Sequence, residues 1–350
     1  KAPIMMQQLE MLMGAEAFKM GVQEYLNAFF MANADWDELV TILDSYTEIN
    51  LKEWAAIWTL ETGRPVIGYS YNNQNNTLEL NALDSSPLPP MWFDVKVNKT
   101  DSPKRIWLDK LPKVVALDSI DLGDEKLIVN ASGIAYGCFV PDFKCREWII
   151  PNINSIENPV ARASTYISLF EMFLEGLIEL DTYTQLLINS IENEKESQVQ
   201  SYILNSLLVV FWQFTPTSER EEISSRIENT LWSLAQSSLP LAQRRAIFST
   251  LASIFITNES FSKLYNAWVD EKIFDIQLSE QERTNLAYEL MIRKPELYHT
   301  IALAEVERIS NPDRIAQFDL ILGAISPNPS HRISFFESLK KPANRKPEPW

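Results

Sequence analysis

The sequence predicts a multidomain, mainly α-helical protein, in which a run of short helices precedes a small antiparallel β-sandwich and then a long helical solenoid. Three observations support this prediction. Apolar residues recur at helical spacing through residues 1–63, the period changes to two over residues 64–147, and helix-start signals return over residues 148–350. Because 350 residues exceed one ordinary hydrophobic core, we expect these three segments to be separate domains.

Two helices are expected at the start of the chain. Met5, Leu9 and Leu12 follow the spacing that lines one helix face, and Gly14 is the residue type that most readily ends a helix. The apolar stripe resumes at once over residues 18–29. We therefore expect the first two helices to follow each other directly, with the break at Gly14.

Two further helices carry start signals of their own. Asp35 with Glu38, and Asn50 with Glu53, place a short polar side chain three residues before an acidic one, which is the spacing of a capping box. Gly63 predicts the end of the fourth helix, because glycine adopts the left-handed backbone conformation without steric cost. The first segment should therefore contain four short helices.

Strand signals fill the next segment. Residues 66–71 and 77–83 alternate around the asparagine-rich turn 72–76, which predicts an antiparallel hairpin. Further short runs, each bounded by Pro, Gly, Asn or Asp, predict strands at residues 91–97, 104–108, 113–117, 126–130 and 134–140. About seven short strands in one segment are typical of a small sandwich.

Helix-start signals return in the last segment. Short polar residues that can bind the free amides of a first turn occur at Asn158, Asp181, Ser218, Ser238, Asn258, Ser279 and Asn311. Helices at this spacing, joined by short polar turns, predict antiparallel pairs stacked as a HEAT/armadillo-like solenoid. The sequence shows no clean repeat, so this prediction depends on helix spacing.

Composition narrows the class of protein. A formal charge of -16 and a sequence pI near 4.7 argue against a nucleic-acid partner, which needs clustered Lys and Arg. The longest apolar runs are too short to cross a bilayer, so we expect a soluble, cytoplasmic or periplasmic protein without a membrane-spanning segment. Cys138, Cys145, His299 and His331 have neither the number nor the spacing of a disulfide scaffold or a zinc site. We assign no catalytic, cofactor-binding or metal-ligating residue.

Several stretches of the sequence resemble one family of enzymes. These stretches are the opening 1–18 with its Gly14 and Phe18, the turn at Asn33-Ala34 before Trp36 and Leu39, the junction of Trp54, Trp58, Gly63, Pro65 and Val66, and the late segments 311–312, 326–329, 335–340 and 342–345. With the predicted order of helices, sandwich and helical array, they resemble the C-terminal half of the aminopeptidase N family of zinc exopeptidases, bacterial type.

This resemblance implies a role for each segment. Residues 1–63 would be the C-terminal helices of a metallopeptidase catalytic domain, residues 64–147 a spacer sandwich, and residues 148–350 a helical domain that limits substrate access. The parent protein would be a zinc-dependent aminopeptidase that hydrolyses N-terminal residues from peptide substrates.

The family's catalytic motif is missing from this segment. The zinc-binding pattern His-Glu-x-x-His does not occur in the sequence, and by resemblance the catalytic tyrosine would lie before Lys1. The resemblance therefore implies a fragment that packs on a missing N-terminal catalytic half. We expect zinc in the parent protein, none in this segment, and no activity from this segment alone.

One residue is a candidate substrate contact. Arg162 could face an interior cavity and meet a peptide carboxylate, as basic residues of the helical domain do in some members of the family that it resembles, but a charge on a first helical turn is more often solvated. Trp92, Trp107 and Trp148 could line a ligand groove, although packing is the commoner use of tryptophan.

An alternative function from a different class stays open. The helical array could be a non-enzymatic scaffold whose concave face binds a protein or peptide partner. The parent sequence upstream of Lys1 separates the two hypotheses, because an intact zinc motif there favours the enzyme.

Overall fold

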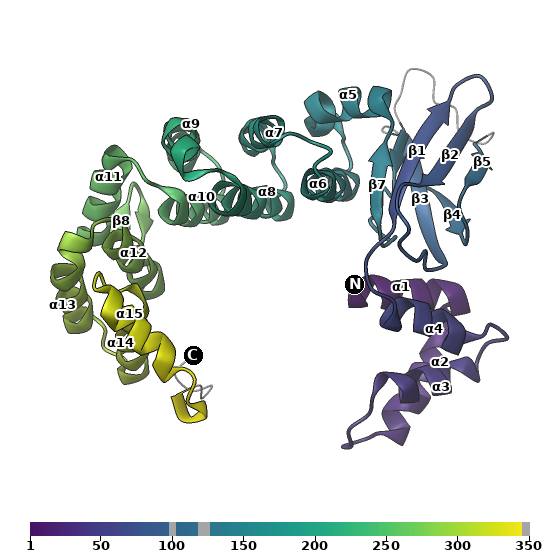
Figure 1. Cartoon of the computed structure of the whole chain (residues 1–350), viewed down its shortest axis with the longest axis horizontal. Helices are drawn as coiled ribbons and strands as arrows, with labels where there is room; N and C mark the ends of the chain where they lie inside the picture. The colour runs from purple at the N-terminus through teal and green to yellow at the C-terminus, as the bar shows by residue number, and fades with distance from the viewer. Residues whose placement is uncertain (98–102, 118–126, 345–350) are drawn as a thin grey trace. The chain divides into compact units, whose positions relative to one another are not determined.

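A computed structural model describes residues 1–97, 103–117 and 127–344, most of which lie in helices, with small sheets between them (Figure 1). Contacts divide the chain into two compact units, Lys1–Leu186 and Leu187–Trp350. The division into three domains at residues 63/64 and 147/148 stays a prediction. Within the described ranges, no helix has both the length and the apolar character that a membrane span requires.

Four short helices begin the first unit, as the sequence predicts. They are α1 (Ala2–Met13), α2 (Ala15–Ala28), α3 (Trp36–Asp44) and α4 (Leu51–Leu60). The capping box of α3 is confirmed, because the Glu38 N–H donates to Asp35 Oδ1 at 3.0 Å and the Asp35 N–H donates to Glu38 Oε2 at 2.8 Å. At the start of α4 the Glu53 N–H donates to Asn50 Oδ1 at 3.1 Å. Local polar spacing therefore predicts both helix starts correctly.

The predicted end of the fourth helix is wrong by three residues. Helix α4 ends at Leu60, because Glu61 already has an extended backbone with ψ 137°. Gly63 does take the left-handed conformation, at φ 88°, but it does so in the turn that leads into the first strand. The glycine signal therefore marks the reversal of the chain rather than the last helical residue.

Among the described residues, seven short strands follow and form two sheets. They are β1 (Val66–Asn72), β2 (Thr77–Ala82), β3 (Met91–Val97), β4 (Lys104–Leu108), β5 (Lys113–Ala116), β6 (Leu127–Val129) and β7 (Cys138–Pro141). One sheet has the order β5-β2-β1-β7 and the other β4-β3-β6. The prediction of a wholly antiparallel arrangement is wrong at one pair, because β1 and β7 are parallel. Apolar alternation predicts strands but carries no information on the direction of a partner far away in the sequence.

The predicted strand at residues 134–140 begins too early. Residues 134–137 form a turn region, because the Asn130 side chain accepts from the Ala135 N–H at 3.0 Å and donates to the Ala135 carbonyl at 3.3 Å. Ile134 is nevertheless buried, so an apolar side chain is needed there although the residue is not in a strand. The first residue of the predicted strand 126–130, Lys126, lies outside the described residues.

A single hydrophobic cluster joins the first helices to both sheets. It contains residues of α1 and α4, of the first sheet and of the second sheet, among them Met5, Leu9, Trp54, Trp58, Ile67, Leu78, Phe93 and Ile106. The fully buried Gln8 adds polar links, since its amide donates to the Trp92 carbonyl at 2.7 Å and accepts from the Trp92 N–H at 2.6 Å. The apolar face of α1 is therefore covered by the sheets.

The first unit ends in helices, of which α5 and α6 pack beside β7 (Figure 1). They are α5 (Phe143–Asn152), α6 (Pro159–Leu174) and α7 (Leu180–Asn193), with a 3-10 turn η1 (Ile153–Ser155) between the first two. The predicted start at Asn158 is confirmed, because the Ala161 N–H donates to its side chain at 2.9 Å. The division between the two units falls within α7.

The second unit is an array of helices with one small hairpin. Its elements are α8 (Ser197–Val209), a π-helical turn η2 (Val210–Phe214), α9 (Thr217–Ala235), α10 (Leu241–Ile254), α11 (Asn258–Val269), β8 (Lys272–Ile273), β9 (Ile276–Gln277), α12 (Glu280–Arg293), η3 (Pro295–Leu297), α13 (Tyr298–Arg308), α14 (Pro312–Ile325), α15 (Pro329–Ser338) and η4 (Pro342–Asn344). Helix α9 packs on α10, each helix from α11 to α15 packs on the next one in sequence, and α8, α10, α12 and α14 also contact one another in that order.

The predicted helix starts in this unit are partly correct. Ser279 forms a full capping box with Glu282, and Asn311 caps α14. Ser218 and Ser238 are not caps, because α9 and α10 begin directly after Pro216 and Pro240. The cap of α11 is Thr257 rather than Asn258. A proline has a backbone angle that already suits a helix start, so the serine signals beside these prolines are misleading.

Candidate functional site

Arg162, the one predicted substrate contact, lies in the first turn of α6. Its Nη1 donates to the Ile156 carbonyl at 2.5 Å and to the Glu157 carbonyl at 3.4 Å. These bonds hold the turn that precedes α6, which gives the half-buried guanidinium a local structural role. The predicted contact with a peptide carboxylate stays a prediction.

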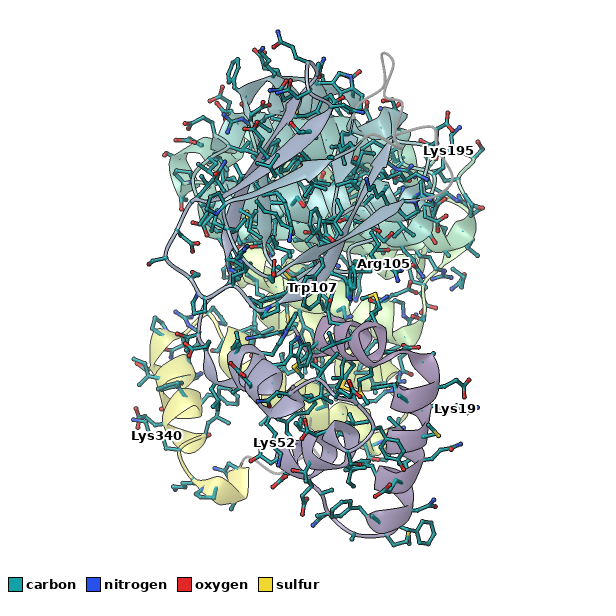
Figure 2. The ribbon with its side chains drawn as sticks, turned by 90° about the vertical axis from the view of Figure 1, so that its right-hand side faces the viewer. Lys19, Lys52, Arg105, Trp107, Lys195 and Lys340 are labelled. Carbon is teal, nitrogen blue, oxygen red and sulfur yellow. The ribbon has the colours of Figure 1, made fainter. Side chains whose placement is uncertain are left out.

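The three tryptophans considered for a ligand groove do not come from one surface. Trp92 on β3 and Trp107 on β4 pair across the second sheet, with ring centroids 5.2 Å apart, whereas Trp148 lies on α5. Figure 2 labels Trp107 beside Arg105 on the same strand. Cross-strand aromatic pairs of this kind stabilise a sheet, so the Trp92–Trp107 contact has a structural explanation.

No potential metal site is found among the described residues. No group of three or more His, Cys, Asp and Glu side chains there is placed to hold a metal ion. His299 packs edge-on against Tyr298, and His331 Nδ1 lies 3.4 Å from Ser326 Oγ. The zinc implied by the family resemblance therefore has no matching set of ligands in the described part of the chain.

Cys138 is the most deeply buried thiol of the described chain. It lies on β7 with no exposed surface, and burial raises the pKa of its thiol to about 11. The neighbouring Arg64 guanidinium opposes this shift, but it is already paired with Glu171 at 2.5 Å and Glu175 at 3.0 Å. A thiol that stays protonated near neutral pH is a poor nucleophile, so Cys138 is a packing residue.

A hollow of about 470 Å³ lies in the second unit, where the C-terminal ends of α9 and α11 meet the β8–β9 hairpin. Strand β8 packs beside α11 (Figure 1). The lining residues are Trp232, Ser233, Gln236, Lys263, Asn266, Ala267, Asp270, Lys272, Ile273 and Phe274. We call this hollow the Trp232 groove.

The floor of the Trp232 groove is aromatic. The indole N–H of Trp232 donates to Ser260 Oγ at 2.8 Å, which fixes the ring. Phe274 meets it edge-on, with ring centroids 6.1 Å apart and planes at 89°. The Lys263 ammonium lies 5.2 Å from the centre of the Trp232 ring and is paired with Glu259 at 2.7 Å. The groove therefore has a rigid apolar surface with one neutralised cation beside it.

The hairpin that supplies Phe274 has an unusual backbone. Phe274 has φ 52° and Glu271 has φ 59°, a left-handed region that side-chain-bearing residues seldom adopt. The tip is fixed by Arg244, which donates to Asp275 Oδ1 at 2.6 Å and Oδ2 at 2.8 Å and lowers the pKa of Asp275 to about 2. The fold therefore holds Phe274 at a costly position with 40% of its surface exposed.

The rim of the Trp232 groove is polar. Five side chains line it without a hydrogen bond or an ion pair to any other described residue, namely Ser233, Gln236, Asn266, Asp270 and Lys272. Asp270 terminates α11, where the helix carbonyls already supply partial negative charge, and Lys272 lies two residues later on β8. The groove therefore presents one anionic and one cationic group around an apolar floor.

Sequence reasoning did not find the Trp232 groove. Its residues come from two helices and a hairpin spread over residues 232–274. The one local signal was the pair Ile273 and Ile276 around a two-residue turn, but that turn is Phe-Asp rather than the Asn-Gly or Gly-containing pair that predicts a tight hairpin.

A second hollow of about 230 Å³ lies between α10 and α12 and is a weaker candidate. Burial raises the pKa of the Glu289 carboxyl in its wall, and burial also raises the pKa of Tyr288 to about 12. The two carboxylates of the wall are both paired, Glu282 with Arg245 at 2.6 Å and Glu289 with Arg293. These ion pairs leave the second hollow without a charge to offer a ligand.

A scan against models of known protein families gives no match to this chain. The likeness to the aminopeptidase N family therefore depends on the residues and the order of elements described above.

Proposed function

We propose that this chain is the C-terminal, structural part of a zinc-dependent aminopeptidase, which packs on a catalytic half that carries the metal and limits access of peptide substrates to it. The order of the elements supports this proposal most directly. In the described part of the chain, four short helices precede a segment of seven strands, and a long array of helices follows. This is the order that the family resemblance implies.

Two finer features of the fold belong to this proposal. Residues of both sheets share one hydrophobic cluster, which supports a β-sandwich that acts as the spacer. In the second unit α8, α10, α12 and α14 contact one another in that order. Helix α9 also packs on α10 and α11 on α12. This arrangement supports a two-layered solenoid of the HEAT/armadillo type.

The surface of α2 supports packing against another part of a longer protein. The only buried residue of this helix is Gly21, whereas Leu26 on α2 is 60% exposed. Just after the helix, Phe30 is 79% exposed and Met31 is 91% exposed. Large apolar side chains gathered on one element commonly mark an interaction surface. We propose that the catalytic half covers them.

The experiment compares this chain with the longer natural protein. This chain should contain no stoichiometric zinc by atomic absorption and should not hydrolyse an aminoacyl-anilide. The longer protein should contain stoichiometric zinc and should hydrolyse the aminoacyl-anilide. Stoichiometric zinc in this chain, or turnover by it, would contradict the proposed location of the site. An upstream sequence without His-Glu-x-x-His and a following Glu would overturn the enzyme proposal itself.

The second candidate function is a non-enzymatic helical scaffold with a bound partner. The observation that favours it is the Trp232 groove, which lies in the helical array and requires no metal. Binding of a ligand there by a parent protein with no hydrolytic activity would support the scaffold over the enzyme.

A further inference from the structure

We propose that the Trp232 groove is a binding site for a free α-amino acid with a large apolar side chain. This inference goes beyond the proposed function, because it needs neither zinc nor a catalytic half.

The charges of the rim match a zwitterion. Asp270 and Lys272 both line the groove, and neither is paired with another described residue. The carbonyls that end α11 add negative potential beside Asp270, so an ammonium group is favoured at that end. Lys272 favours a carboxylate on the side of β8. A purely anionic ligand would meet Asp270, and a purely cationic one would meet Lys272.

An α-amino acid carries its ammonium and carboxylate groups on the same carbon atom. This suits the opposite charges of Asp270 and Lys272, which are two residues apart in the sequence. The Ser233 hydroxyl and the Gln236 and Asn266 amides add donors and acceptors without partners of their own among the described residues. A few polar groups that converge over an apolar floor are typical of small-ligand sites, and the volume of about 470 Å³ is within their usual range.

The floor selects the side chain of the ligand. Trp232 and Phe274 meet at right angles, and the face of an aromatic or branched aliphatic side chain can pack in the angle between them. Phe274 occupies a left-handed position where glycine would be less strained. Strain of this kind is concentrated at functional sites, so an exposed aromatic residue held at this position indicates that its ring is used.

The test measures binding of five probes by isothermal titration calorimetry. L-phenylalanine should bind, whereas phenylalaninamide without the carboxylate and N-acetylphenylalanine without the ammonium should each bind about tenfold more weakly or worse. Glycine, which lacks the side chain, should show no binding. A Phe-Phe dipeptide tests whether a short peptide fits better than the free amino acid, and tighter binding of the dipeptide would overturn the assignment to a free amino acid.

Three variants of the Trp232 groove test which residue contacts which group of the ligand. Lys272→Gln should remove the preference for L-phenylalanine over its amide, and Asp270→Asn should remove the preference over the N-acetyl form. Phe274→Gly should abolish binding while thermal stability is kept or raised, because glycine relieves the left-handed strain. Lys19→Gln is the control, since Lys19 is exposed on α2 in the other unit and its side chain points into solvent (Figure 2).

Besides tighter binding of the dipeptide, three results would overturn the proposal. These are no binding of L-phenylalanine, equal binding of the acid, the amide and the N-acetyl form, or unchanged binding in all three groove variants. These binding results do not depend on whether the longer protein contains zinc or hydrolyses the anilide. Failure of this inference is therefore distinguishable from failure of the proposed function.

Discussion

The first four helices and the helices of the second unit are stabilised in different ways. Helix α2 buries only Gly21. Helix α1 contributes Met5 and Leu9 to the cluster shared with both sheets, and the amide of Gln8 binds Trp92 on the second sheet. In the second unit, polar side chains of one helix bind the backbone at the end of another. Glu228, for example, accepts from the Ile256 N–H at 2.8 Å and from the Thr257 N–H at 3.1 Å.

The same kind of link recurs along the array. Arg293 of α12 donates to the Phe255 carbonyl at 2.6 Å and the Ser253 carbonyl at 2.9 Å, both at the end of α10. Gln243 of α10 donates to the Lys195 carbonyl at 3.1 Å. The array therefore secures its own helix ends, whereas the first helices depend on the sheets and leave apolar surface exposed.

Glu305→Ala should produce the largest loss of stability, and it acts on the array. Glu305 is fully buried, accepts from the Trp268 indole N–H and is paired with Arg308. Its loss leaves the largely buried Arg308 guanidinium without its ion-pair partner, so we expect the free energy of unfolding to fall by about 3 to 5 kcal/mol. Urea denaturation measures this change.

The matched control for that prediction is Glu307→Ala on the same helix, which is exposed and should change stability by less than about 0.5 kcal/mol. Equal effects of the two substitutions would show that the buried carboxylate does not secure the array.

Gln8→Leu should have the second largest effect, and it acts on the first unit. The substitution leaves the Trp92 N–H and the carbonyls of Trp92 and Ile134 without the partner that they now share. We expect a loss of about 2 to 3 kcal/mol, because buried polar groups without hydrogen bonds are costly. Hydrogen exchange of β3 should rise, while α10 stays protected. The exposed Gln7→Leu is the control, and a loss as large there would contradict this account.

Asp35→Ala and Ser279→Ala should have a smaller effect on stability, and they compare one kind of helix cap in the two units. The two residues form the same capping box in different units, at α3 and at α12. Each substitution should cost about 1 kcal/mol, because a capping bond is local and depends little on what surrounds the helix. A much larger cost at Ser279 would indicate that its cap is part of the tertiary network of the array.

Asp275 gives the smallest predicted effect, which depends on pH. Its pKa is lowered from 3.8 to about 2 in the folded protein by the hydrogen bond from Arg244. A lowered folded pKa means that the carboxylate adds stability above pH 3.8 and loses this contribution as the pH falls through about 2. NMR titration of the carboxyl carbon measures this pKa directly. Arg244→Gln should return the pKa towards its ordinary value, and an unchanged pKa would exclude the Arg244 contact as its cause.

Local features of this fold could be predicted from sequence, and non-local ones could not. The caps at Asp35, Asn50, Ser279 and Asn311 are correct because each signal lies within one helical turn. The Gln8 link joins residues 84 apart in sequence, and no local pattern reports it. The predicted strand wrongly includes Ile134, because a buried apolar residue of a turn region cannot be told from a strand residue by sequence.

The candidate site shows the same limit. Arg162 could be singled out as a charge on a first helical turn, but its carbonyl partners at Ile156 and Glu157 depend on the path of the chain. The Trp232 groove needs two helix ends and a strained hairpin to meet, and none of these three alone marks a site.

Hydrogen exchange of α2 tests the central claim that the first helices complete their packing on another part of a longer aminopeptidase. The amides of α2 should be protected about tenfold more in the longer protein that we propose than in this chain. The amides of α10, whose apolar face is already buried, should exchange equally in both. Equal protection of α2 in the two proteins would contradict the claim.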